Sequence, residues 1–275
     1  MSRIVIWDYG YSGAEDIAAA IAIVTSLYQR RRVLLINEED VGHGVEQGFP
    51  VYDAAVNRDS SKITETGTEA LLRLLITQRI SRYNFVDYTR PLINSRLDLI
   101  PGASGGLNRQ ADAALLQQLY AVAEDVYEFV FLHRSGMSLP VEEAEEVLLL
   151  PVLQQNRIGL DPFFAYYRSC SEVSRNKVKG IILRNYDRQA KWNIANIKRY
   201  YNCEIPIYGI CYDTGFADSW NEHDLLRYFR RIHLPGRMGA KRGTMLEALQ
   251  ELGGALSAVS DNYLPPSSLS DDKGA

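Results

Sequence analysis

The chain has 275 residues, of which 46% are hydrophobic and 23% are charged, and its formal net charge is −4. A chain of this length and apolar content can bury one large core. Its weakly acidic balance excludes a global positive field that would attract nucleic acid or an anionic membrane.

Cysteine and histidine spacings give no sign of a disulfide framework or a metal site. Cys170, Cys203 and Cys211 form an odd set without CxxC spacing, which favours buried thiols in a reducing compartment. No two histidines have the i, i+4 spacing that presents two imidazoles from one helix. The chain also lacks a secretory signal pattern and any run of about 18 apolar residues, so we expect a cytoplasmic protein without a transmembrane segment or metal.

Apolar runs alternate with helical segments along the chain. The expected strands are residues 4–7, 33–36, 97–100, 127–132, 147–153, 178–183 and 205–210. The expected helices are residues 14–27, 66–80, 110–123, 221–231 and 244–259, the last interrupted at Gly253-Gly254. Because parallel strands need crossover helices, this alternation predicts a doubly wound α/β domain with a mostly parallel sheet.

The domain boundary is expected near the C-terminus. Residues 1–259 are predicted to form one α/β domain. Residues 260–275 contain Pro-Pro-Ser-Ser and Asp-Asp-Lys and are too polar to bury a core, which predicts a disordered tail.

A glycine-containing loop, D-Y-G-Y-S-G at residues 8–13, joins the first strand to the first helix. Such loops bind phosphate in α/β proteins, because backbone N–H groups and the helix N-terminus favour an anion. Gly10 and Gly13 are equally compatible with a tight turn that needs glycine for steric reasons. The loop alone therefore leaves both interpretations open.

From residue 3 to about residue 235 the chain resembles the ParA/MinD/TadZ family of deviant Walker ATPases, whose fold is a P-loop NTPase-like three-layer sandwich. The family loop K-G-G-x-G-K-T corresponds to Y-G-Y-S-G-A-E at residues 9–15. Tyr9 and Ala14 replace the two lysines, and Glu15 replaces the hydroxyl that would ligate magnesium. Since phosphoryl transfer depends on positive charge around the phosphate, the resemblance implies that the family's hydrolysis is lost.

Further segments carry the same resemblance. V-L-L-I-N-E-E at residues 33–39 is similar to V-L-L-I-D-x-D and places Asn37 and Glu39 at the aspartate positions. Y-E-F-V-F-L-H at residues 127–133 places His133 at the acidic Walker B position, where an imidazole cannot anchor magnesium-bound water. In I-I-L-R-N at residues 181–185, Asn185 matches the family's adenine-reading asparagine, although asparagine also favours strand-end turns.

These matches imply a degenerate nucleotide pocket. Its candidate residues are Gly10, Ser12, Gly13 and Asn185, with Ala14, Glu15, Glu39 and His133 at the other motif positions. No catalytic residue and no cofactor is expected, with ATP kept as an alternative ligand.

The resemblance, which includes a TadZ-like segment at residues 145–156, implies a positioning or assembly factor. Its expected partners are a second copy of the chain, through Tyr9 and Tyr11, and components of a pilus or secretion apparatus. One alternative is an atypical ATPase switch in which Arg134 or Arg109 supplies the missing charge. The other is DNA binding through a basic cluster, three of whose arginines lie on nearly one helical face and are also explained by a solvated face. That cluster comprises Arg227, Arg230, Arg231, Arg237, Lys241 and Arg242.

Overall fold

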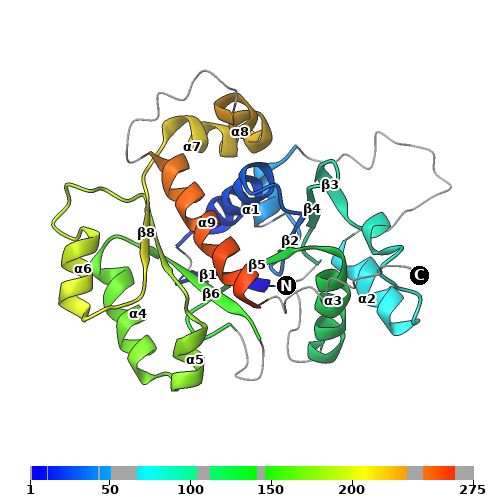
Figure 1. The fold of residues 1–275 in the computed structure, drawn as a ribbon, viewed down its shortest axis with the longest axis horizontal. Coiled ribbons are helices and arrows are strands. Elements are labelled where there is room, and N and C mark those ends of the chain that lie inside the picture. Colours follow the sequence, from blue (N-terminus) through cyan, green and yellow to red (C-terminus); the bar gives the residue numbers. More distant parts are fainter. Residues whose placement is uncertain are drawn as a thin grey trace, which may run out of the picture.

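The computed structural model of the protein describes residues 2–10, 12–42, 44–50, 67–103, 112–140, 146–233 and 244–263. Within these residues an eight-stranded sheet has the order β3-β4-β2-β5-β1-β6-β7-β8 (Figure 1). The strands are β1 Ser2–Tyr9, β2 Val33–Asn37, β3 Arg90–Ile93, β4 Leu97–Ile100, β5 Phe129–Gly136, β6 Leu148–Gln154, β7 Ile181–Arg184 and β8 Ile207–Ile210. Every pairing is parallel except that of β3 with β4, so the predicted doubly wound, mostly parallel sheet is confirmed.

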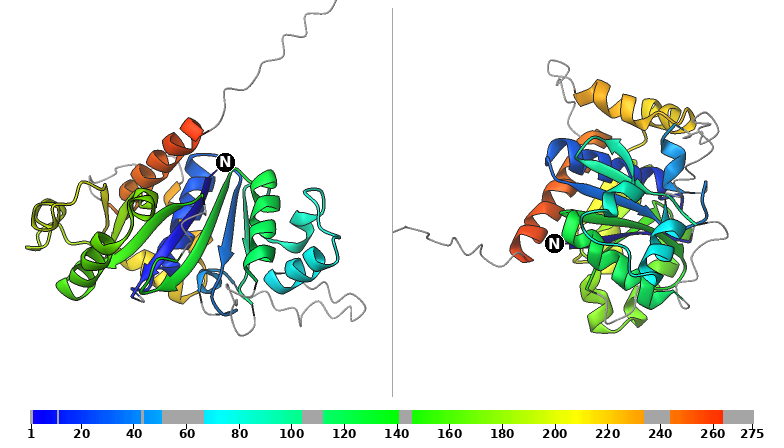
Figure 2. Two further views of the ribbon diagram at one scale, coloured as in Figure 1. Left: turned by 90° about the horizontal axis from the view of Figure 1, so that it is seen from below. Right: turned by 90° about the vertical axis from the view of Figure 1, so that its right-hand side faces the viewer.

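Helices cover both faces of the sheet (Figure 2). They are α1 Glu15–Tyr28, α2 Thr68–Ile76, α3 Ala113–Val126, α4 Arg157–Ser169, α5 Glu172–Lys177, α6 Ile194–Tyr201, α7 Thr214–Asn221, α8 Leu225–His233 and α9 Met245–Tyr263, with 3-10 turns η1 Val45–Gly48 and η2 Phe85–Tyr88. One buried cluster joins the sheet to α1, α7, α8 and α9, and a second joins its other face to α2, α3, α4 and α6. In the described part of the chain, no helix is both long and apolar enough to cross a membrane.

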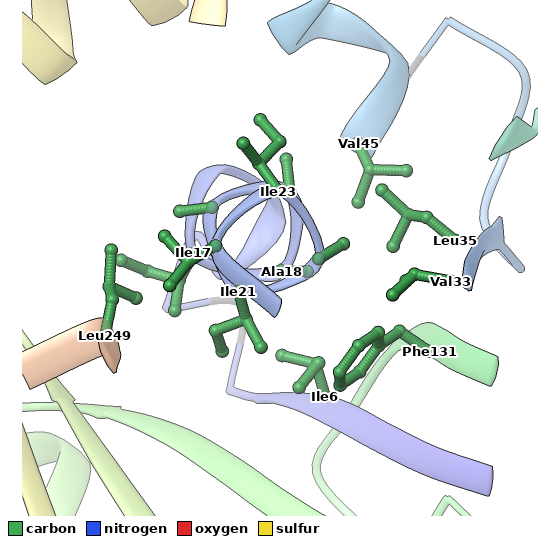
Figure 3. Packing of buried hydrophobic residues seen from close by; sticks show 14 of the residues in the cluster. Ile6, Ile17, Ala18, Ile21, Ile23, Val33, Leu35, Val45, Phe131 and Leu249 are labelled. Atoms are coloured by element: carbon green, nitrogen blue, oxygen red, sulfur yellow. The ribbon is translucent and has the colours of Figure 1, made fainter. Parts of the chain in front are cut away.

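Helix α1 is the most enclosed helix of the first layer. Its residues from Asp16 to Ser26 are all buried, and the alanines among them let neighbouring segments approach closely. Figure 3 shows the side chains of Ile6 and Phe131 from the sheet, Val45 from η1 and Leu249 from α9 around this helix. The N-terminus of α1 is therefore fixed relative to the ends of the central strands.

Helix α9 differs from the prediction, because it continues through Gly253-Gly254. Two glycines in a helix cost about 1 kcal/mol each relative to alanine. Leu249, Leu252 and Leu256 are buried in the cluster that includes α1, and this packing offsets the glycine penalty. The helix also passes the expected domain boundary and ends at Tyr263, while residues 264–275 lie outside the described residues.

The segment before α8 also departs from the expected helix at residues 221–231. Helix α7 ends at Asn221, and His223 has a left-handed backbone (φ 58°), so a turn separates α7 from α8. Helices α4, α5, α6 and α7 and the antiparallel edge strand β3 were not predicted, because these short or polar segments carry weak periodicity.

Strand alternation separates two polar pairs at the ends of β2 and β5. Asn37 and His133 are register partners and follow strand residues that face α1. Glu38 and Arg134 follow them along the chain and therefore point to the opposite face. The two pairs lie side by side in sequence but in different layers of the molecule.

The Glu38–Arg134 ion pair is almost fully buried, with side-chain exposures of 0% and 4%. Both Nε and Nη2 of Arg134 donate to the Glu38 carboxylate, the latter at 3.0 Å, and Nη1 donates to the Pro140 carbonyl at 2.7 Å. The hydroxyl of Tyr120, on α3, also donates to Glu38. This network ties the ends of β2 and β5 to the second helical layer.

Arg134→Met should lower the free energy of unfolding by about 3–5 kcal/mol, because it leaves the Glu38 carboxylate buried without its ion-pair partner. The double variant Glu38→Leu/Arg134→Met should recover most of that loss. Urea unfolding monitored by circular dichroism measures both. As a control, Arg157→Met removes the exposed ion pair with Asp161 and should cost less than about 1 kcal/mol. Equal losses for the two single variants would contradict the assigned role of burial.

Burial raises the pKa of Asp98, on β4, and this effect outweighs the hydrogen bond that its carboxylate accepts from the Tyr127 hydroxyl at 2.7 Å. The folded state therefore holds this proton more tightly than the unfolded state does. The contribution of Asp98 to the free energy of unfolding consequently falls as pH rises from about 4 through the folded pKa. Asp98→Asn should flatten this part of a pH–stability profile, whereas Asp87→Asn, at an exposed position of η2, should leave it unchanged. Identical profiles for the two variants would contradict the prediction.

Candidate functional site

The loop after β1 lies at the carboxyl edge of the sheet, the edge at which the parallel strands end. Strand β1 is central, between β5 and β6, and the loop leads directly into α1. Gly10 and Gly13 both have left-handed backbones, with φ of 67° and 77°. The turn geometry by itself therefore explains both glycines.

Asp8 accepts hydrogen bonds from Ser12 of this loop. Its side chain is 1% exposed, and Ser12 donates to Oδ1 through its backbone N–H at 2.5 Å and its hydroxyl at 2.6 Å. The Ser12 hydroxyl also lies 2.9 Å from the Val152 carbonyl, and its single hydrogen serves one acceptor at a time. A carboxylate of the protein thus binds the Ser12 N–H that a loop-bound phosphate would use.

Arg184, at the end of β7, is the cation that reaches the loop. Its Nη2 donates to Asp16 Oδ2 at 2.6 Å, and its Nη1 donates to the Ser12 carbonyl at 3.2 Å. A Cβ at Gly13 would lie 2.7 Å from Nη1, so the guanidinium would have to shift to admit a side chain there. Burial raises the pKa of Asp16, and the charge of Arg184 opposes this shift.

The sequence did not single out Arg184, although it directly follows the apolar residues of a predicted strand. Arg134, which the ATPase-switch alternative named as one of two candidate cations for the loop, lies on the opposite face of the sheet and pairs with Glu38, so it does not supply charge to the loop. Arg109 lies outside the described residues.

Glu15 is the first residue of α1 and is half-buried beside Asp8 and Asp16. Burial is the largest cause that raises its pKa, and the charges of Asp8 and Asp16 add to the shift, while Arg184 opposes it. Three carboxyl groups thus meet one guanidinium around the described part of the loop. Like charges crowded at low solvent exposure are typical of functional sites.

His133 completes this cluster from the end of β5. The ring is fully buried, and Nδ1 lies 3.4 Å from Oδ1 of Asn37. A ring nitrogen of His133 and carboxylate oxygens of Asp8 and Glu15 all lie within 4.8 Å of one another. Local spacing could not reveal this group, because its members come from the end of β1, the start of α1 and the end of β5.

The remaining predicted pocket residues have different positions. Ala14 is fully buried in the core around α1, and Glu39 accepts a hydrogen bond from the Ser135 backbone N–H at 2.7 Å. Asn185 is exposed in a left-handed turn (φ 52°) after β7, as expected of a strand-end asparagine. Its neighbour Arg184, not Asn185, makes the hydrogen bond to the loop.

Tyr9 does not form a surface for a partner, which corrects the expected dimer contact. It is 5% exposed, and its ring packs edge-on against Trp7 and Phe163 with centroids 5.3 Å away from each. Alternation along β1 explains this position, since Tyr9 points away from the face that carries Asp8. Tyr11 lies outside the described residues. The three cysteines are half-buried and not fully buried as expected.

Comparisons with known proteins identify the fold. No protein-family model and no curated protein sequence matches the chain. A ParA family ATPase from Chlorobium tepidum superposes with a TM-score of 0.68 at 13% identity, over 92% of this chain and 98% of that one. The MinC:MinD cell division complex of Aquifex aeolicus gives a TM-score of 0.61 at 13% identity, over 92% and 96% of the two chains.

A putative plasmid partition protein from Borrelia burgdorferi, bound to AMPPNP, gives a TM-score of 0.58 at 11% identity, over 95% of this chain and all of that one (100%). The TM-scores establish the fold, whereas identities this low do not establish function, which has to be argued from the site. The chain therefore has the fold of the ParA and MinD ATPases.

Proposed function

We propose that this protein is a ParA/TadZ-like positioning or assembly factor that binds protein partners as a homodimer and does not hydrolyse ATP. The observation that carries the proposal is the charge around the loop: Asp8, Glu15 and Asp16 surround it, and Arg184 is paired with Asp16. The MinC:MinD complex is an example of this fold bound to a different protein. The TadZ-like segment at residues 145–156 suggests pilus or secretion components as the partners.

The loop does not suit a magnesium-bound triphosphate. Ala14 offers a buried methyl group where a lysine would hold phosphate charge, and Glu15 offers a carboxylate that would repel it. The Ser12 N–H is already bonded to Asp8. A triphosphate would therefore enter a region of like charge and find this donor occupied.

The alternative of an atypical nucleotide switch rests on Arg184, the cation at the loop. To bind a phosphate, its guanidinium would have to share or leave Asp16, a carboxylate that is itself buried. Breaking this partly buried ion pair would leave the buried Asp16 carboxylate without its compensating charge, which is unfavourable. This argument favours the nucleotide-independent factor.

DNA binding is the third candidate. Helix α8 carries three exposed arginines, Arg227, Arg230 and Arg231. Nη1 of Arg227 lies 3.8 Å from Oδ2 of Asp224 in the preceding turn. Residues 237, 241 and 242 lie outside the described residues. The three described arginines fit a solvated helix face, and DNA affinity that falls steeply with salt would instead support the DNA-binding alternative.

Titration calorimetry with ATP or ADP and Mg²⁺ should give no binding up to millimolar concentration, and light scattering should give the same dimer with and without nucleotide. Micromolar binding that drives dimerisation would contradict the proposal and support the switch. In that case Arg184→Ala should weaken binding at least tenfold. Arg188→Ala, an exposed arginine in the turn after the same strand, should leave it unchanged.

The proposed dimer surface lies at the carboxyl edge, where Val41, Met137 and Tyr212 are 48%, 54% and 63% exposed. Each follows the end of a parallel strand, and the Met137 sulfur lies 3.2 Å from the position of a Cβ at Gly10. Methionine and tyrosine are enriched in protein interfaces.

Met137→Asp should convert the dimer to a monomer in light scattering, because it places a charge in an apolar contact. Ile76→Asp is a matched control, since Ile76 is 66% exposed at the far end of α2. That helix begins beside Pro101, at the end of β4, and runs away from this edge. If Met137→Asp remains a dimer, the interface lies elsewhere.

A further inference from the structure

We propose that Asp8, Glu15 and His133 bind one divalent transition-metal ion without the help of a nucleotide. Two carboxylates and one imidazole supply oxygen and nitrogen donors, the set that suits Zn²⁺, Mn²⁺ or Fe²⁺. The donor atoms lie within 4.8 Å of one another, so small side-chain adjustments would bring them onto a common ion.

The first argument is the environment of Asp8. Its side chain is buried, and the two hydrogen bonds that it accepts from Ser12 both end on Oδ1. In the part of the chain that the structure describes, no group donates to Oδ2 and no cation pairs with this carboxylate. Buried carboxylates are normally paired with a cation or coordinated to a metal, and Ser12 provides only neutral donors.

The second argument is the local charge balance. Arg184 neutralises Asp16, and Asp8 and Glu15 together contribute two negative charges when ionised. The N-terminus of α1 supplies roughly half a positive charge, which is too little to balance them. A divalent cation would balance the remaining charge.

The third argument is the orientation of the imidazole. Asn37 Nδ2 donates to the Glu46 carboxylate at 2.7 Å, which fixes the amide with its oxygen toward Nδ1 of His133. An amide oxygen only accepts, so Nδ1 carries the ring hydrogen and Nε2 carries the lone pair. Metal-binding histidines are held in the same way, by donation from the second ring nitrogen to an oxygen.

The donor set also predicts which ions bind. Mg²⁺ prefers an all-oxygen octahedron, so the imidazole disfavours it relative to Zn²⁺. Three protein ligands leave at least one coordination position for water or an exogenous anion. The site is thus distinct from one in which a nucleotide supplies the phosphate ligands for magnesium.

Titration of the untagged, nucleotide-free protein with Zn²⁺ in a calorimeter tests the site. One ion per chain should bind, and millimolar Mg²⁺ should not displace it. Glu15→Gln keeps the shape of the half-buried side chain and removes its charge, and should weaken Zn²⁺ binding at least tenfold. His133→Gln should weaken it by a similar or larger factor, with circular dichroism verifying that both variants are folded.

Two controls separate this site from other zinc-binding groups. His223→Gln removes an exposed histidine, and Cys203→Ser removes a half-buried thiol, and neither should change the affinity. An anomalous difference peak at the zinc edge among Asp8, Glu15 and His133 in a crystal would locate the ion. Absence of Zn²⁺ binding, or an unchanged affinity in Glu15→Gln, would overturn the proposal whatever the result with ATP.

Discussion

The burial of helix α1 against the central strands is the constraint on which the candidate site depends. Its alanine-rich sequence lets the sheet, η1 and α9 pack closely around it, so its first turn has one position relative to β1 and β5. Glu15 and Asp16 begin this helix, and they are consequently held beside Asp8 at low solvent exposure. The crowding of carboxylates follows from a packing arrangement that one of the two buried clusters stabilises.

The period-two geometry of strands determines which charges share a layer. At the ends of β2 and β5, Asn37 and His133 face α1, while Glu38 and Arg134 face α3. The second pair is satisfied within the protein, because the guanidinium binds the carboxylate through two nitrogens and Tyr120 adds a third donor. His133 of the first pair lies beside Asp8 and Glu15, and Arg184 is already bound to the neighbouring Asp16. One layer therefore balances its charges within the protein, and the other keeps unbalanced negative charge.

Unbalanced charge at a buried site reduces stability. Proteins keep such charge mainly at functional sites, where it binds a ligand. This argument connects the two proposals, since carboxylates that repel a triphosphate attract a metal ion. In the proposed function, the same carboxyl edge contacts protein partners without depending on a bound nucleotide. The exposed side chains of Val41 and Met137 at that edge fit this interpretation.

The amino-acid sequence by itself determined the parallel α/β architecture, because apolar runs such as residues 33–36 and 127–132 report strands buried on both faces. It also identified the loop at residues 9–15 and the missing lysines, which are local properties of the chain. Only the tertiary structure decided that Tyr9 is buried, that Arg184 and not Arg134 reaches the loop, and that His133 lies beside Asp8 and Glu15. These relations depend on strand register and on the face to which each side chain points. A one-residue change of register reverses that face, and no local spacing in the sequence specifies it.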